Sequence, residues 1–191
     1  MTWHRHSPLL QEGVVPLDLC AALMDHAANE TPRPRSFQGV VDSSLRDSAY
    51  VRVPVPLEEA VLSHCAVPIH GHFGVRPRSV PRQSAVIYRY GVGVGFVAHH
   101  DEVTEIERAR ARTNGQPVVG GDLTLVVWLN SPDTYDGGEL FFEQPPLEFK
   151  PPCGSLVAFP ATRDHVHGVR PIVRGERCTL VIRTHVGDAS G

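Results

Sequence analysis

Two histidines and an aspartate stand together in the stretch AHHD, residues 98–101. In a β-strand the side chains of residues i and i+2 point to the same face, so His99 and Asp101 would project together and His100 would project away. A histidine and a carboxylate on one face supply two ligands of a facial triad, in which two histidines and one carboxylate bind a metal and leave its opposite face open. Because His-x-Asp also occurs by chance on surfaces, the spacing alone is a weak indication of a metal site.

A third ligand must come from another part of the chain, and two histidines compete for this role. His165 and His167 both lie in the stretch RDHVHGVRPIVRGER, residues 163–177. A redox-active triad of this kind usually needs a second molecule that supplies electrons, and a dicarboxylate in that role would need a cation at its far end. Arginine suits this task because its planar guanidinium pairs with a carboxylate through two hydrogen bonds. Arg177, ten residues after His167, is the candidate.

The elements that position these residues are helical in the first part of the chain and β-rich afterwards. The stretch 16–29, PLDLCAALMDHAAN, has apolar residues at helical spacing and a proline suited to a first turn. A second helix is expected over residues 57–70, LEEAVLSHCAVPIH, which Pro68 should shorten or bend. Five short β-rich runs follow, separated by turn residues: SAVIYRY, DLTLVVWLN, GELFFE, GSLVAFP and CTLVIRTH. This order predicts a sandwich or barrel with a helical N-terminal part packed on it.

The longest polar insertion in the β-rich part is the loop 102–121, EVTEIERARARTNGQPVVGG. Loops of this length in compact domains are usually functional or mobile, so the segment is either a lid over a site or a solvated connection. The sequence leaves both alternatives open.

Composition excludes several classes of function. The 191 residues are 41% hydrophobic and carry a formal net charge of −3, without a basic run of the kind that binds nucleic acid. No apolar stretch approaches the roughly 20 residues of a membrane span, and the opening MTWHRHSPLL does not resemble a secretory signal, so we expect a cytoplasmic protein. The four cysteines show no C-x-x-C spacing and are expected to be small buried side chains.

The run from Tyr90 to Asp101 resembles a known family. Tyr90, Gly93, Phe96, His99 and Asp101 reproduce the pattern Y-x-x-G-x-x-[YF]-x-x-H-x-D of prolyl-4-hydroxylase-like dioxygenases, which depend on Fe(II) and 2-oxoglutarate. Later motifs follow in the order that the family has: LTLVVWLN, a Gly-Gly-Glu-Leu turn, PPCGSLVAFP, a distal histidine and a basic residue ten positions later.

The resemblance covers roughly residues 84–186 and implies a mainly β fold. This fold is a double-stranded β-helix of the jelly-roll, cupin-like type, with N-terminal helices packed on it. We therefore expect a single Fe(II)/2-oxoglutarate dioxygenase domain over residues 1–191. Its helical N-terminal part would span about 1–80 and its catalytic β core about 83–186.

Carried over residue by residue, the resemblance assigns His99, Asp101 and His167 as the iron ligands and catalytic centre. It assigns Arg177 to the distal carboxylate of 2-oxoglutarate. It also assigns Tyr90 to this co-substrate, with an ordinary core tyrosine as the alternative.

The family spacing also decides between the two competing histidines. The basic residue expected ten positions after the distal histidine is Arg177 when counted from His167, whereas the count from His165 ends at Gly175. The resemblance therefore selects His167. It leaves His100 and His165 beside the site or on the surface.

The family's chemistry implies hydroxylation of an unactivated C–H bond with decarboxylation of 2-oxoglutarate to succinate. Fe(II), 2-oxoglutarate and O2 are the expected cofactors, with ascorbate as a candidate reductant. Asp101 favours hydroxylation, because related halogenases have a small residue in place of the carboxylate. We expect a free amino acid or a similar small anionic metabolite as substrate and neither nucleic acid nor membrane as partner, and the sequence carries no signal for an oligomeric state. The alternatives are a peptidyl or protein prolyl hydroxylase and, from another class, a non-catalytic cupin-like barrel that binds a metal or ligand.

The last predicted strand departs from the family. Alternation places Arg177 and Arg183 on the same inward face, and many relatives have tryptophan where this chain has Arg183. A buried, unpaired arginine is costly, so Arg183 should have an acidic partner, either on an anionic substrate or within the protein. Trp128 shares a face with Thr124 and Val126 on an earlier strand and is the second candidate for substrate contact, with a core position as its alternative.

Overall fold

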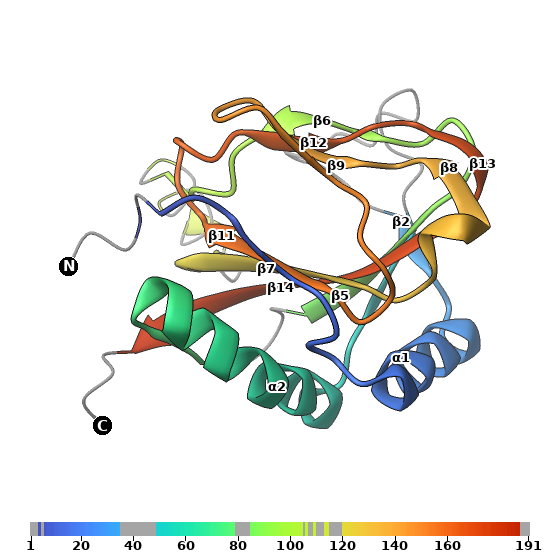
Figure 1. The fold of residues 1–191 in the computed structure, drawn as a ribbon, viewed down its shortest axis with the longest axis horizontal. Coiled ribbons are helices and arrows are strands. Elements are labelled where there is room, and N and C mark those ends of the chain that lie inside the picture. Colours follow the sequence, from blue (N-terminus) through green and yellow to red (C-terminus); the bar gives the residue numbers. More distant parts are fainter. Residues whose placement is uncertain are drawn as a thin grey trace.

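A computed structural model of the chain has two β-sheets that face each other, with two helices against the outer face of the larger sheet (Figure 1). The structure describes residues 4, 6–34, 49–78, 85–104, 106, 109, 113–114 and 120–187. Most of the loop 102–121 lies outside the described residues, so both alternatives for it stay predictions. None of the described helices combines the length and the apolar character that crossing a bilayer requires.

The two helices form where hydrophobic spacing predicts them. Helix α1 spans Leu17–Asn29, directly after Pro16. Helix α2 spans Val55–Phe73 and continues through Pro68. This proline therefore does not shorten the helix, and the alternative expectation, a bend, stays a prediction. A proline in a helix removes one backbone hydrogen bond, and burial of apolar side chains along α2 offsets that loss. The buried apolar residues of α2 are Val61, Leu62, Cys65, Ile69 and Phe73.

The larger sheet has the strand order β1-β11-β7-β14-β5-β3-β2, and β4 pairs with β14. Every pairing in it is antiparallel. The N-terminal part supplies strands as well as helices, because β1, β2 and β3 all precede α2. The strands of this sheet span Leu9–Gln11 (β1), Arg33–Pro34 (β2), Ala49–Arg52 (β3), Arg76–Arg78 (β4), Ala85–Tyr90 (β5), Leu123–Trp128 (β7), Leu156–Pro160 (β11) and Arg177–Gly187 (β14).

The smaller sheet has the order β10-β9-β12-β6, and β13 pairs with β8 beside it. These shorter strands lie across from the inner face of the larger sheet (Figure 1). They span Phe96–His99 (β6), Tyr135–Gly137 (β8), Leu140–Phe142 (β9), Leu147–Phe149 (β10), His167–Val169 (β12) and Ile172–Gly175 (β13), and a short 3-10 helix, η2 (Pro132–Thr134), precedes β8. The five β-rich runs noted in the sequence correspond to β5, β7, β9, β11 and β14.

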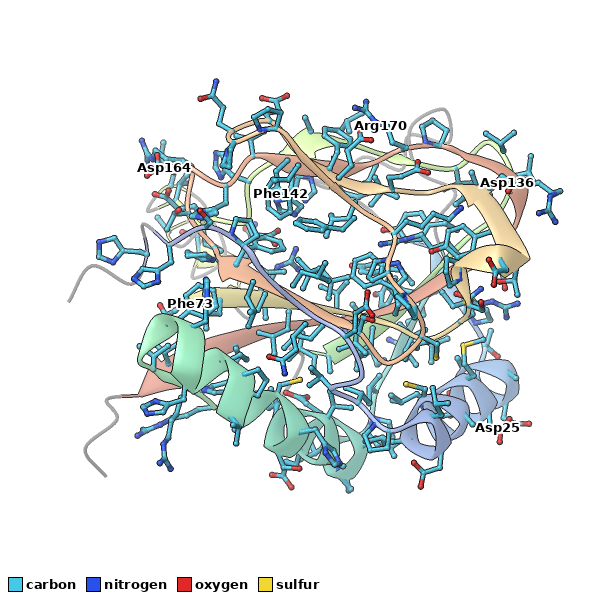
Figure 2. The ribbon with its side chains drawn as sticks, in the orientation of Figure 1. Asp25, Phe73, Asp136, Phe142, Asp164 and Arg170 are labelled. Carbon is cyan, nitrogen blue, oxygen red and sulfur yellow. The ribbon has the colours of Figure 1, made fainter. Side chains whose placement is uncertain are left out.

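Alternation along the central strands produces two separate cores. On β7, Leu125 and Val127 belong to the core beneath the helices, whereas Val126 and Trp128 belong to an aromatic core between the sheets. Both faces of β7 are therefore buried, which explains its nearly continuous apolar sequence. Figure 2 shows side chains filling the space between the sheets, where Phe142 lies.

Strand β14 alternates in the same way and has the inward face that the sequence predicts. Its outward residues pack in the core beneath the helices: Cys178, Leu180 and Ile182. Its inward residues line a cavity between the sheets: Arg177, Thr179, Val181 and Arg183. The larger sheet thus holds two arginines toward the cavity, and the smaller sheet closes it from the other side.

Candidate active site

The side chains of His99, Asp101 and His167 converge in the cavity between the sheets. His99 ends β6 and His167 begins β12, and these two residues are directly opposite each other in the antiparallel pair. Opposed residues project to the same side, and the two imidazole centroids are 4.4 Å apart. Asp101 Oδ1 lies 3.7 Å from His99 Nε2, and Asp101 Oδ2 lies 3.8 Å from His167 Nε2. One ligand atom from each residue lies within 4.8 Å of the other two, so the three predicted ligands form one cluster.

Backbone carbonyls orient both imidazoles. His99 Nδ1 is 2.9 Å from the carbonyl oxygen of Val97, and His167 Nδ1 is 2.9 Å from the carbonyl oxygen of His165. A carbonyl oxygen only accepts, so each Nδ1 carries the proton that it donates, and in the neutral ring each Nε2 keeps its lone pair. Both lone pairs are thus on the nitrogens nearest Asp101, as binding of one metal ion by all three residues requires.

Asp101 is buried and receives hydrogen bonds from two residues of the larger sheet. Thr124 Oγ1 donates to Asp101 Oδ2 at 2.7 Å, and Arg183 Nη2 donates to Asp101 Oδ1 at 2.6 Å. Burial by itself raises the pKa of Asp101, but the Arg183 guanidinium, the two histidines and the Thr124 hydroxyl together hold this pKa well below its ordinary value. Asp101 is therefore an ionised carboxylate, and because a carboxylate has about four lone-pair sites, it can still bind a cation.

The surroundings of His167 suit this residue to metal binding. Burial lowers the pKa of His167, while the Asp101 charge and the hydrogen bond to the His165 carbonyl oppose this shift. The net lowering keeps the ring neutral at neutral pH, and only a neutral imidazole ligates a metal. Two nitrogen donors and one carboxylate oxygen on one side of a site are the donor set of a facial triad, which fits ferrous iron.

Arg177 is a fully buried cation in the same cavity, and no carboxylate in the described part of the chain forms an ion pair with it. Its Nη1 donates to Thr179 Oγ1 at 3.2 Å, and its Nε has no hydrogen-bond partner among the described residues. Its guanidinium carbon lies 5.2 Å from the ring centroid of Tyr90 and 5.1 Å from that of Trp128. Burial lowers the pKa of Arg177, yet a guanidinium keeps its charge at neutral pH. A buried charge with an unmet donor is costly, so this geometry suits an anion that enters from outside.

The cavity connects the three clustered ligands to Arg177. Tyr90 is part of its wall, beside Arg177, where the sequence predicts contact with the co-substrate. The residues that line it are Tyr88, Tyr90, Phe96, His99, Asp101, Thr124, Val126, Leu140, His167, Val169, Arg177, Thr179, Val181 and Arg183.

Two residues predicted to contact the substrate differ in position. Arg183 lines the cavity, and its acidic partner is Asp101. Of the two partners expected for this arginine, a substrate anion or an acid within the protein, the structure contains the second. Trp128 is fully buried against Arg177 and lies outside the lining residues, which agrees with its core alternative.

The two other histidines of the predicted site take different positions. His100 is exposed. His165 is buried: its Nδ1 is 2.9 Å from Thr162 Oγ1, and its carbonyl accepts the hydrogen bond of His167. His165 therefore orients the ligand that follows it two residues later.

Sequence reasoning missed two contacts that shape the site. Thr124 donates a hydrogen bond to Asp101, and the only signal in the sequence was a hydroxyl on the inward face of an apolar strand. Its position opposite Arg183 follows from the β7–β14 register, which the structure reveals. An exposed pair joins Glu102 to Arg163, whose Nη2 and backbone nitrogen donate to the Glu102 carboxylate at 2.8 and 2.9 Å. This pair links the residue after Asp101 to the loop before His167, and no sequence spacing signals a contact across 61 positions.

Comparison with known sequences gives one family match and several relatives. The model of the 2OG-Fe(II) oxygenase superfamily matches residues 85–184. A PKHD-type hydroxylase of Gluconacetobacter diazotrophicus is 38% identical over 92 residues, which cover 47% of this chain and 37% of that protein. A PKHD-type hydroxylase of Xanthomonas axonopodis pv. citri is 37% identical over 106 residues, which cover 53% of this chain and 44% of that protein. The chain thus spans about half the length, or less, of these curated relatives.

Solved structures share the fold over most of the chain. A prolyl-4-hydroxylase of Pseudomonas putida superimposes with a TM-score of 0.67 at 19% identity, covering 94% of each chain. A prolyl hydroxylase from Trichoplax adhaerens, in complex with a hypoxia inducible factor peptide fragment, superimposes with a TM-score of 0.70 at 14% identity, covering 94% of this chain and 84% of that one. At these identities the likeness concerns the fold, and it confirms the predicted double-stranded β-helix with N-terminal helices.

Proposed function

The chain belongs to the 2OG-Fe(II) oxygenase superfamily, and on this basis we propose that it is an Fe(II)- and 2-oxoglutarate-dependent hydroxylase of a small anionic molecule. The substrate class is a free amino acid or a similar metabolite, and the reaction is hydroxylation of an unactivated C–H bond. One observation carries the proposal: a His-Asp-His cluster and a buried arginine without an ion pair in the described chain share one cavity.

The three clustered residues have the roles of metal ligands in this proposal. His99, Asp101 and His167 would hold the iron through two Nε2 atoms and one carboxylate oxygen. When bound, Fe(II) with 2-oxoglutarate and O2 would supply the oxidation, with one oxygen atom of O2 going to succinate, formed with loss of CO2, and the other to the substrate C–H bond. The carbonyls of Val97 and His165 keep the ligand nitrogens facing one point, because they hold the opposite nitrogen of each ring.

Arg177 binds the distal carboxylate of 2-oxoglutarate. The free Nε and the full burial of the side chain support this role, because a carboxylate would satisfy the donor and neutralise the charge. Tyr90 lies beside the guanidinium and lines the same part of the cavity, which supports its role in holding the co-substrate. Trp128 is the second aromatic ring beside the Arg177 guanidinium and restricts its position.

The balance of charge in the cavity supports an anionic substrate. Apart from the histidines, its charged lining residues are Asp101, Arg177 and Arg183, which leave one net positive charge. A divalent metal and a 2-oxoglutarate dianion cancel each other, so the positive charge remains after both have bound. A buried uncompensated charge is costly, and a carboxylate or phosphate on the substrate would neutralise it. Arg183 donates to Asp101 through one nitrogen, Nη2. Because a guanidinium has five N–H donors in all, Arg183 also has donors that a substrate anion could use.

A peptidyl prolyl hydroxylase is the second candidate. It is favoured by a surface pocket beside the loop that leads to His167, because an extended peptide needs an open surface next to the metal. The pocket is lined by Glu143, Gln144, Arg163, Asp164 and Val166. The structural neighbours named above are prolyl hydroxylases, and those names, which describe the neighbours themselves, also favour this candidate.

The activity is tested by succinate release from 2-oxoglutarate in air, with Fe(II) and with ascorbate as reductant. Free amino acids and proline peptides are screened separately, and the masses of the products are measured by mass spectrometry. His99→Ala is the control. Substrate-stimulated succinate with a product heavier by one oxygen atom establishes the hydroxylase and selects the substrate class. Slow His99-dependent release without stimulation keeps the enzyme class and removes the screened substrates. No His99-dependent release from an iron-loaded protein favours a non-catalytic binding barrel.

The anionic requirement is tested on the substrate rather than on the protein. We expect each accepted amino acid to lose about 100-fold or more in kcat/KM when its carboxylate is replaced by a carboxamide, since a buried charge then loses its partner. Equal turnover of acid and amide would contradict the proposed substrate class and leave the oxygenase assignment intact.

A further inference from the structure

The carboxylate of Asp101 is fixed by side chains rather than by a strand. Asp101 lies two residues beyond the end of β6 and belongs to no strand in the described part of the chain. Instead Arg183 binds one carboxylate oxygen at 2.6 Å and Thr124 binds the other at 2.7 Å. The torsional position of this carboxylate therefore depends on two directed hydrogen bonds.

The two donors come from neighbouring positions of a rigid surface. Arg183 on β14 and Thr124 on β7 are direct partners in the antiparallel register. Both strands are central in the larger sheet and covered by the helices on the other face. The histidines, in contrast, stand on the smaller sheet. The contacts to Asp101 thus connect the two sheets at the candidate metal centre.

We propose that Arg183 is a positioning residue of the metal centre, which together with Thr124 holds the Asp101 carboxylate where it completes the ligand set of His99 and His167. This inference rests on the proposed function, because it concerns the same metal site. It adds a role that is independent of any substrate. In this role Arg183 acts through Asp101.

Two effects of Arg183 on metal binding oppose each other. Its positive charge competes with a metal ion for Asp101, which favours tighter binding once the arginine is removed. Its hydrogen bond orients the carboxylate in a buried position, which favours weaker binding after removal. The second effect dominates because the Asp101 side chain is only 4% exposed, so without Arg183 one carboxylate oxygen would lose its buried partner and the carboxylate would turn away from His99 and His167.

The test measures Mn(II) affinity of the purified full chain by calorimetry and by electron paramagnetic resonance. Mn(II) reports on the site without turnover and binds weakly enough for changes to be measured. We expect Arg183→Met to bind Mn(II) about 10–100-fold more weakly, the range found when partners of metal ligands are removed. Arg183→Lys should lose less, because an ammonium keeps the charge and one donor, and Thr124→Val should lose about 10-fold.

Arg174→Met is the matched control. Arg174 also forms a 2.6 Å ion pair, with Asp136, but both side chains are mostly exposed and lie away from the cavity. The Mn(II) affinity and the electron paramagnetic resonance spectrum of the Arg174→Met variant should equal those of the unmodified protein.

The outcomes separate the positioning role from the metal site itself. Unchanged or tighter Mn(II) binding by folded Arg183→Met and Arg183→Lys would overturn the positioning role, while loss of binding in His99→Ala would still support the metal site. If Arg183→Met does not fold, as judged by circular dichroism, Arg183→Lys and Thr124→Val decide the question. No Mn(II) binding by the unmodified protein, or binding insensitive to His99→Ala, would overturn the proposed function and the positioning role together.

Discussion

His99 and His167 are direct partners across two antiparallel strands, and their imidazole centroids lie 4.4 Å apart. They are separated by 68 positions in the chain, yet the strand register gives both side chains the same direction. Each ring donates through Nδ1 to a backbone carbonyl two residues before it. The pair therefore faces Asp101 with its two Nε2 atoms, and this geometry leads to the first prediction.

Replacement of either clustered histidine should abolish metal binding. His99→Ala and His167→Ala each remove one of three ligands, and we expect at least a 100-fold loss of Mn(II) affinity, consistent with the larger effect of a direct ligand than of its partners. His100→Ala is the control, because this neighbouring histidine is exposed and lies outside the cluster. Equal losses in His99→Ala and His100→Ala would contradict the assignment of the site.

Arg177→Met should weaken 2-oxoglutarate binding and stabilise the ligand-free protein. Loss of a buried charge partner costs about 2–5 kcal/mol, so the affinity of the Mn(II)-loaded protein for 2-oxoglutarate should fall about 30-fold or more. Without ligand the same change removes a buried cation that has no ion-pair partner in the described chain and one unmet donor, Nε, so stability should rise by about 1–4 kcal/mol in chemical denaturation. Arg174→Met, at an exposed arginine, should change neither quantity. A ligand-free protein destabilised by Arg177→Met would argue that the arginine has a structural role.

Gly138→Ala should disturb Arg177 through a direct clash. Gly138 has φ +72°, and an added Cβ would lie 2.5 Å from Ile172 Cδ1 and 3.0 Å from Arg177 Cδ. Gly74→Ala is the matched control, because its φ is +70° and nothing lies within 4 Å of an added Cβ. Both changes should cost about 1–2 kcal/mol for the left-handed backbone. Gly138→Ala should cost a further ~1–3 kcal/mol for overpacking and should lower 2-oxoglutarate affinity. Equal melting temperatures of the two variants would show that the neighbours of Gly138 move aside without cost.

Stability should fall above pH 9 because of a buried thiol. Burial raises the pKa of Cys65 from 9.0 to about 12. The unfolded thiol loses its proton near pH 9 and the folded one near pH 12, so the stabilisation is complete below pH 9 and is lost as pH rises toward 12. The slope for this group is about 1.4 kcal/mol per pH unit. Urea unfolding of the unmodified protein and of Cys65→Ala should therefore converge in free energy between pH 9 and pH 11, and parallel curves would refute the prediction.

Local periodicity was enough to predict most elements, and its failures have specific causes. Helix α2 extends through Pro68 because burial along the helix outweighs one missing hydrogen bond. The short strand β1 was not expected, because it forms only through pairing with β11, whose residues lie far away in the sequence. Propensity summed over three residues cannot reveal such a partner.

The sequence by itself determined the metal-ligand types, their spacing and the inward face of the last strand. Side-chain alternation in a strand is a local property, so Arg177 and Arg183 could be placed on one face without knowing what they face. Only the tertiary structure decided that Arg183 pairs with Asp101, that Thr124 shares this carboxylate, and that Arg177 has no ion-pair partner in the described chain. These contacts are set by strand register and sheet packing between segments more than 20 positions apart, and burial makes each of them energetically decisive.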